Sequence, residues 1–328
     1  MSNPNLISSF IDKLSKEQIN YYSFNELKEI EWNNHINKLE NSKLFFSSNK
    51  IDYDREYYNS KYFLALLFNQ NKNLCGFKFY LVHNKIYLYQ PFFSKNFEYL
   101  LGVKIIKTIN SFFNEQQIKV DIINLFNTNQ LNEKFKILFC KNRYVLIPGY
   151  DMFVDLNYSE EYLWKTIRKS FKSFINNGRK IFSLKKITSY RRFDDCRLLH
   201  KKVSGSITRS QRTWDIQYKD LKEDKSVVFY IEDDHENIIG FSIFNIGDTI
   251  VNYSVGVYDR DKFNYLQISH FILWESILYF KNTHKYLYLG NYNPELKEKN
   301  IKLSNINDFK MGFCNHIVSN SILEVKNI

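Results

Sequence analysis

Two stretches of the chain, 62–93 and 226–258, follow the same pattern and constrain the fold more than any other feature. Each contains three short runs of β-branched and aromatic residues separated by two tight polar turns, a pattern typical of consecutive β-hairpins. The two stretches align without a gap, so that Gly76-Phe77 falls on Gly240-Phe241. In the later stretch the predicted strands are 227–231, 238–246 and 249–257.

A repeat this far apart predicts a duplicated domain. The separation between the copies is far too long for a solenoid repeat, and a chain of 328 residues suits about two domains. We therefore expect an α+β chain of two tandem domains, 1–156 and 157–328, each with a mixed, mainly antiparallel sheet flanked by helices. The alternative is that two unrelated β-meanders look alike.

Apolar spacing predicts the remaining elements. A basic helix at about 159–178 is expected to bridge the two halves, with Ser159 as its N-cap and Gly178 as its stop. Other helices are expected at 24–41, 97–113, 132–140, 193–203, 215–221, 263–280 and 306–312, and strands at 120–126, 144–156, 184–190, 286–290 and 316–325.

The net charge of +11 indicates an anionic partner, which can be nucleic acid, a phosphorylated cofactor or a membrane surface. The alternative is that lysine serves as a generic solvated surface residue. The four cysteines have no metal-ligand spacing, so we expect reduced core cysteines and no metal site. The sequence lacks a signal peptide and any apolar run near the ~20 residues that span a membrane. We therefore expect a cytoplasmic protein that makes at most peripheral membrane contact.

Three local motifs point to a known family. A Leu-Trp-x-x-x-Arg-Lys pattern at 163–169 opens the basic helix, the segment 200–217 joins two predicted helices, and 308–313 reads Asp-Phe-Lys-Met-Gly-Phe. In this order, and with the predicted succession of strands and helices, they resemble the Fem-type family of peptidyltransferases and acyltransferases, which are tandem GNAT domains. The resemblance covers the chain from Asp151 onward; before that point it is one of architecture.

The resemblance implies an N-acyltransferase or aminoacyltransferase whose second domain carries the site. It implies an activated acyl donor, acyl-CoA rather than aminoacyl-tRNA, and an amino group on a cell-wall or surface-glycan precursor as acceptor. One departure concerns the donor. The segment 258–265, where a GNAT phosphate loop is expected, contains no glycine, and glycines are what let backbone amides approach a pyrophosphate.

Acyl transfer to an amine needs a proton acceptor, a polarised carbonyl and a protonated leaving group. We expect His200, Tyr253 and Asp259 to serve these catalytic roles. For substrate or cofactor binding we expect Arg209, Trp214, Gln217, Ser254 and Lys310. Each has a plainer alternative: a helix-face histidine, a strand or core aromatic, a turn aspartate, a surface arginine or a snorkelling lysine.

Two other functions compete with transfer. The basic bridge helix and the abundant aromatics suit an RNA-binding protein, whose affinity would fall steeply with salt. The absence of the glycine-containing phosphate loop also fits a third possibility, a protein that kept the fold but is catalytically inactive and serves as a scaffold.

Overall fold

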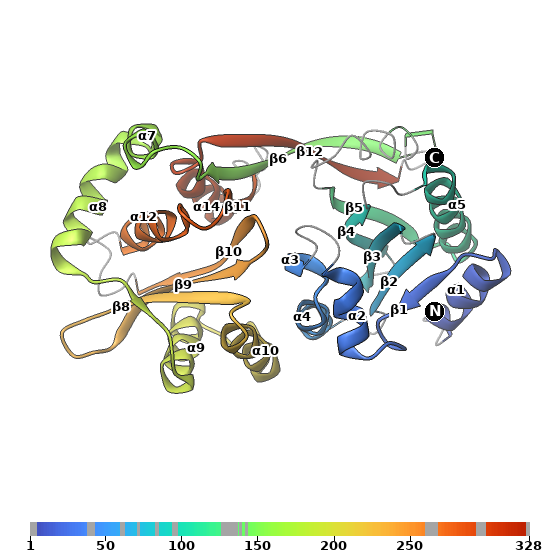
Figure 1. The fold of residues 1–328 in the computed structure, drawn as a ribbon, viewed down its shortest axis with the longest axis horizontal. Coiled ribbons are helices and arrows are strands. Elements are labelled where there is room, and N and C mark those ends of the chain that lie inside the picture. Colours follow the sequence, from blue (N-terminus) through green and yellow to red (C-terminus); the bar gives the residue numbers. More distant parts are fainter. Residues whose placement is uncertain are drawn as a thin grey trace. The chain divides into compact units, whose positions relative to one another are not determined.

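The architecture comes from a computed structural model that describes residues 5–37, 43–59, 63–70, 73–82, 85–93, 98–125, 137, 140–141, 144–259, 268–292 and 300–325. The chain divides into two compact units, residues 1–149 with 319–328, and residues 150–318. Figure 1 shows the two units, each built from one twisted sheet with helices packed on it. The predicted α+β class, with mixed, mainly antiparallel sheet flanked by helices in each unit, is confirmed.

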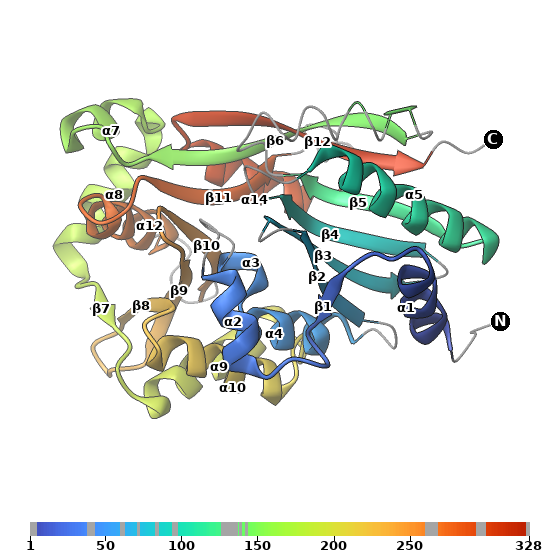
Figure 2. The same ribbon diagram turned by 45° about the vertical axis from the view of Figure 1, so that its right-hand side comes forward.

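The first unit is a sheet in the order β1-β2-β3-β4-β5-β12, in which only β4 and β5 pair in parallel. Its strands are β1 (Tyr21–Ser23), β2 (Phe63–Gln70), β3 (Asn73–Val82), β4 (Lys85–Phe93), β5 (Lys119–Leu125) and β12 (His316–Val325). Helices α1 (Leu6–Lys16) and α5 (Tyr99–Glu115) share one apolar core with the sheet. Helices α2 (Glu29–Ile36), α3 (Lys43–Phe46) and α4 (Ser48–Tyr58) contribute to a second core that includes Trp32. Figure 2 shows these three helices close together beside the strands of the first unit.

The second unit is a sheet in the order β6-β11-β10-β9-β8-β7, in which only β10 and β11 pair in parallel. Its strands are β6 (Tyr144–Asp155), β7 (Lys185–Lys186), β8 (Ser226–Glu232), β9 (Ile238–Ile246), β10 (Ile250–Tyr258) and β11 (Tyr286–Tyr292). One core holds side chains of α7 (Glu160–Thr166), α8 (Lys169–Ile181) and α12 (Ile268–Phe280), and the other those of α9 (Tyr190–Ser204) and α10 (Gln211–Lys222). Helix α14 (Ile301–Met311) lies against β11.

The predicted repeat is present in the structure. Strands β2, β3 and β4 repeat as β8, β9 and β10, and in each copy consecutive strands are antiparallel neighbours. In both copies the third strand then pairs in parallel with the strand that follows the next helix, β5 or β11. The two meanders therefore belong to one domain plan.

The division of the chain differs from the predicted boundary at 156. Strand β6 runs through this region, and its residues 150–155 pair with β11, so the second unit already begins at Tyr150. Residues 319–328 group with the first unit because β12 pairs there with β5, Ser321 opposite Leu125. The chain end thus returns to the first sheet, which its position in the sequence does not reveal.

The single bridge helix predicted at 159–178 is wrong in two respects. Ser159 does cap α7, but the helix breaks at Ile167, whose ψ of 151° is extended. There the N–H of Arg168 donates to the carbonyl of Gly312 at 2.8 Å. Gly178 does not stop the helix; it lies inside α8, where a Cβ would meet Phe271 Cβ at 2.6 Å. The glycine permits close packing of α8 on α12.

Several predicted bounds also change. The strand predicted at 184–190 is only two residues long, because Ser189 caps α9 and the chain becomes helical at Tyr190. Helix α2 begins at Glu29 rather than at 24, and the predicted segment 132–140 lies almost wholly outside the described residues. In the described part of the chain, no helix has both the length and the apolar character to cross a membrane.

Candidate functional site

The sheet of the second unit opens between its two parallel strands. Pairing of β10 with β11 ends at Asn252 and Tyr288, although the structure describes β10 to Tyr258 and β11 to Tyr292. Beyond this point each strand stays bonded to its outer neighbour, β9 or β6. The two strands therefore separate inside the sheet, and their backbone groups beyond Asn252 and Tyr288 do not pair with each other.

A β-bulge marks the start of this opening. The register of β10 against β9 shifts between Tyr253 and Val255. As a result Tyr253 joins the core of α7, α8 and α12, while Val255 joins the core of α9 and α10. Ser254, at the bulge, is exposed. Bulges re-aim side chains next to active sites, and here the bulge presents Ser254 to solvent beside the opening.

Lys310 of α14 reaches the same opening. Its Nζ lies 5.7 Å from the centre of the Tyr253 ring, and 3.0 Å from where a Cβ on Gly290 of β11 would be. Gly290 has a φ of +108°, which favours glycine, so the backbone leaves this space to the ammonium. Burial lowers the pKa of Lys310 to about 8. Within the residues that the structure describes, this ammonium makes no hydrogen bond and no ion pair.

Three hydroxyl groups gather over β10 beside Lys310. The Oη atoms of Tyr253 and Tyr258 are 2.8 Å apart, and Tyr258 Oη lies 2.9 Å from Ser242 Oγ. Gly256 makes this possible, since a Cβ there would lie 2.0 Å from Tyr253 Oη. Burial raises the pKa of Tyr253, although its bonds to the other two hydroxyls oppose the shift. The cluster can pass a proton between its members while staying neutral.

A buried carboxylate lies at the start of the opening. Asp151 of β6 accepts hydrogen bonds from Tyr288 Oη at 2.8 Å and from Asn291 Nδ2 at 2.7 Å. Tyr288 is the last residue of β11 that pairs with β10. Asp151 thus orients the side chains of β11 where the strands separate.

A second group of predicted residues comes together between α9 and α10. Arg209 donates from Nη1 to Gln217 Oε1 at 3.2 Å, and its guanidinium lies 5.3 Å from the Trp214 ring centre. The His200 ring packs edge-on against Trp214. Trp214 is only 3% exposed, which places it in the core and does not fit the predicted stacking on a ligand.

His200 and Asp259 also do not fit the predicted catalytic roles. Burial, with a contribution from Arg209, lowers the pKa of His200 to about 4. A base this weak does not take a proton from an amine efficiently near neutral pH. Asp259 is buried, and its Oδ2 lies 2.5 Å from Lys202 Nζ in an ion pair. This pair fixes the end of β10 to α9.

The structure therefore brings Tyr253, Ser254 and Lys310 together at the opening and places His200, Arg209, Trp214 and Gln217 elsewhere in the unit. Tyr258, Ser242 and Asp151, which also lie at the opening, were not among the predicted site residues. Tyr258 had a usable signal, because it ends the meander strand that carries Tyr253. The segment 260–267, where the phosphate loop was expected, lies outside the described residues.

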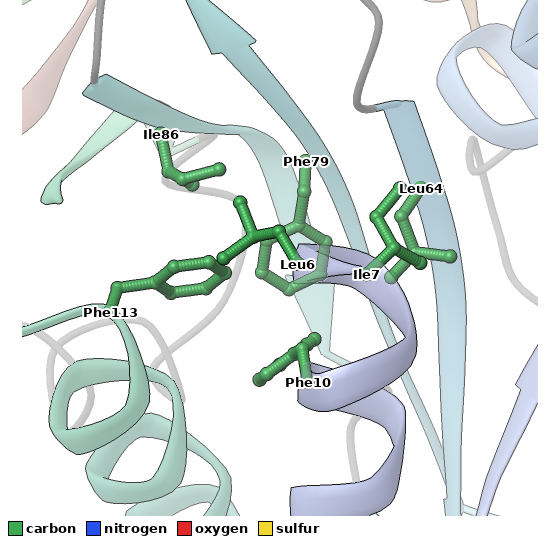
Figure 3. Close-up of a pocket in the computed structure, with 7 residues that line it drawn as sticks. All are labelled: Leu6, Ile7, Phe10, Leu64, Phe79, Ile86 and Phe113. Atoms are coloured by element: carbon green, nitrogen blue, oxygen red, sulfur yellow. The ribbon is translucent and has the colours of Figure 1, made fainter. Parts of the chain in front are cut away.

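The described residues offer neither a metal site nor a large apolar pocket. No group of three or more His, Cys, Asp or Glu side chains there is arranged to hold a metal ion. A small pocket in the first unit is lined only by apolar side chains (Figure 3), namely Leu6, Ile7, Phe10, Leu64, Phe79, Ile86 and Phe113. Its volume of about 10 Å³ barely admits one water, so it is a packing gap and not a substrate site.

No protein-family model and no curated protein matches this sequence. Solved structures do match in fold. FemX has a TM-score of 0.68 at 9% identity, over 94% of this chain and 98% of its own. The C-terminal domain of a putative lysylphosphatidylglycerol synthetase from Agrobacterium fabrum has a TM-score of 0.63 at 8% identity, over 91% of each chain.

A third structure is a tandem GNAT protein from the clavulanic acid biosynthesis pathway, with a TM-score of 0.50 at 8% identity, over 94% of this chain and 99% of that one. These structural similarities extend over both units. They include the first unit, where the sequence resembled the family only in the predicted order of strands and helices and not in local motifs. The chain therefore has the fold of the Fem-like tandem GNAT proteins.

Proposed function

We propose that this chain is an N-acyltransferase or aminoacyltransferase whose reaction takes place at the opening between β10 and β11. One observation carries the proposal: a partly buried ammonium, that of Lys310, lies at the opening without an anionic partner among the described residues. Structural lysines in protein interiors are normally paired. A desolvated cation kept where the two strands separate fits the stabilisation of a negative charge that develops during a reaction.

The chemistry assigns roles to the residues at the opening. The amine of the acceptor attacks the donor carbonyl, a C–N bond forms, and the carbonyl oxygen becomes negative. Lys310 is positioned to stabilise this oxygen. Collapse of the intermediate breaks the C–S bond of a thioester or the C–O bond of an ester. Tyr253 and Tyr258 can then deliver a proton to the leaving group, and the proton that the attacking amine loses, passed directly or through solvent, restores the hydroxyl cluster.

We propose acyl-CoA as the donor and an amino group on a cell-wall or surface-glycan precursor as the acceptor. The acyl-CoA assignment is supported by the tandem GNAT fold. The structure of the tandem GNAT protein from the clavulanic acid pathway is described as one without AcCoA, which names this compound as the ligand left out. Aminoacyl-tRNA is the alternative donor; it is favoured by the likeness to FemX and to a putative lysylphosphatidylglycerol synthetase. Ser254, exposed at the bulge, is proposed to contact the substrate.

The test is a transfer assay that follows the mass of the acceptor. The protein is incubated with acyl-CoA esters or charged tRNA and a panel of amino sugars. Replacement of Lys310 by Met should lower the rate about 10²–10³-fold, the range for loss of one oxyanion donor. Lys302→Met, an exposed residue of the same helix, is the matched control and should keep full activity.

Undiminished transfer by Lys310→Met would remove Lys310 from the reaction and, with it, the proposed site. If the folded wild-type protein moves no group from either class of donor, the silent scaffold becomes the better account.

A further inference from the structure

The second unit carries a strongly basic surface that the proposed reaction does not use. Residues 162–193 contain ten Lys and Arg residues and no Asp or Glu. In the structure this stretch forms α8, β7, the start of α9 and all of α7 except its first two residues, Glu160 and Glu161, which are exposed and acidic. We call the exposed surface of α7, α8 and β7 the basic flank; Figure 1 shows its two helices on the outer side of the unit, beyond α12.

Most cations of this stretch are not neutralised by neighbours. Lys165 pairs with Glu161, Arg179 with Glu275, and Lys185 and Arg192 with Glu232. Among the residues that the structure describes, the other six form no ion pair: Arg168, Lys169, Lys172, Lys180, Lys186 and Arg191. A concentration of one sign of charge, without partners, attracts an anionic surface.

The apolar face of α8 is already in use. Phe171 and Ile175 are buried in the core shared with α12, while Lys169 and Lys180 lie on the opposite, exposed face. The helix therefore cannot insert into a bilayer as a free amphipathic helix would. Any contact that it makes with an anionic surface is made through its charges.

Exposed side chains with apolar bodies flank the cations at both ends. Tyr158 and Tyr162, at the start of α7, are 43% and 44% exposed, and Ile181, at the end of α8, is 56% exposed. Tyrosines and aliphatic side chains beside lysines suit the boundary between lipid headgroups and acyl chains.

The aromatic rings of the flank are poorly suited to stack on nucleic-acid bases. The rings of Tyr158 and Tyr162 stack on each other with centres 4.2 Å apart. Trp164, at the centre of the flank, has Lys172 and Arg179 over its ring and packs edge-on against Trp274. Recognition of unpaired RNA depends on open aromatic faces, so the arrangement favours a lipid surface over RNA.

We propose that the basic flank docks this protein on the surface of a membrane rich in anionic lipids. The contact is electrostatic and reversible, with the two tyrosines and Ile181 entering the headgroup region. It goes beyond the proposed transfer activity and does not depend on it. Polybasic surfaces bind anionic bilayers in proportion to the number of Lys and Arg residues near the lipid.

The test measures binding of the full chain to vesicles by co-sedimentation at low salt. Vesicles of equal parts phosphatidylglycerol and phosphatidylcholine should bind the protein, and pure phosphatidylcholine vesicles should not. The variant Lys169→Gln/Lys172→Gln/Lys180→Gln should weaken binding ~100-fold, since each lysine near the surface contributes a factor of about five. Binding should also fall as salt is raised.

The matched control is Lys281→Gln/Lys285→Gln/Lys302→Gln, which removes the same charge from other parts of the unit. It should keep nearly full binding, and circular dichroism should show both variants folded. Equal loss in the two variants, or no binding of the wild type to the anionic vesicles, would overturn the proposal. So would binding to a short RNA duplex in place of vesicles, lost in the flank variant alone.

Discussion

The two units share one plan but use a lysine in opposite ways. In the first unit Lys78 of β3 is fully buried, and its Nζ donates to Asp54 Oδ2 at 2.7 Å and to the carbonyl of Phe45 at 2.6 Å. In the second unit the aligned position is Ser242, and the buried cation is instead Lys310, which comes from a later helix. Both ammonium groups are desolvated, but only Lys78 has a carboxylate partner among the described residues.

The two lysines differ in what compensates the cost of burying them. Burial opposes ionisation of Asp54, but Lys50 and Lys78 outweigh it and keep the pKa of that carboxyl below its ordinary value. Among the described residues of the first unit, the buried Asp54 and Lys78 thus satisfy each other's charge. The second unit leaves a cation at an opening in the sheet, where an anionic group of a ligand can satisfy it. Functional sites are where local stability is given up in this manner.

The largest change is expected in the free energy of unfolding when Lys78 and Lys310 are replaced separately. Lys78→Met should lower the free energy of unfolding by about 3–5 kcal/mol, because it leaves Asp54 buried without one of its partners. Lys310→Met should leave the free energy of unfolding unchanged or raise it, because no carboxylate loses a partner. Chemical denaturation measures both.

The double variant Lys78→Met/Asp54→Asn tests the reason for the first effect. It should recover part of the stability, since the carboxylate is then neutral. If Lys78→Met and Lys310→Met destabilise the protein equally, the contrast between the two units does not hold.

A smaller effect is expected from adding one methyl group at the hydroxyl cluster. Gly256→Ala places a Cβ 2.0 Å from Tyr253 Oη and 2.7 Å from Tyr258 Oη, so the two hydroxyls must shift from their present positions. Displacing a reacting group by about 1 Å costs up to about a hundredfold in rate, and transfer activity should fall by that order in steady-state assays.

Gly178→Ala is the matched control, because its Cβ would crowd Phe271 in the core between α8 and α12. It should destabilise the unit by about 1–3 kcal/mol, as overpacking does, with activity per folded molecule unchanged. A loss of activity in the control as large as in Gly256→Ala would assign both effects to packing.

The smallest effect is expected in the pH dependence. The pKa of Lys310 is lowered from 10.5 to about 8, so the folded protein keeps this cation below about pH 8 and loses it above. If the cation is required, the transfer rate should fall about tenfold for each pH unit above that value. In the control variant Lys78→Met the transfer rate should begin to fall at the same pH as in the wild type. A wild-type rate that stays constant up to pH 10 would exclude a role for the Lys310 cation.

The effect of the same lysine on stability has the opposite sign. Between about pH 8 and 10.5 the unfolded chain holds a proton on Lys310 that the folded chain lacks. Stability therefore rises with pH across this window. Denaturation of the wild type and of Lys310→Met at several pH values isolates this contribution.

Local patterns predicted the elements well where periodicity was strong. Strands β8 to β10 and helix α5 lie within a few residues of their predicted bounds, because alternating or helical apolar spacing reflects which face is buried. Gly178 shows the limit: a glycine that ends helices elsewhere lies inside α8, where Phe271 from a distant helix occupies the space of its side chain.

The structure divides the predicted site residues into two groups. Tyr253, Ser254 and Lys310 were identified and lie at the opening, but His200 and Asp259 were given catalytic roles that their surroundings do not support. His200 and Asp259 were predicted to be catalytic because histidine often serves as a general base and aspartate as a general acid or base. The protein environment, through burial and Lys202, decides whether either role is available.

The sequence by itself determined the duplication, because the spacing of apolar runs and turns is a local property that burial imposes on each copy. Only the tertiary structure decided where the strands separate, which lysine is paired and which is not, and that the chain end returns to the first sheet. These depend on contacts between residues far apart in the chain, such as Lys310 with Gly290 and Tyr253, and no local pattern records them.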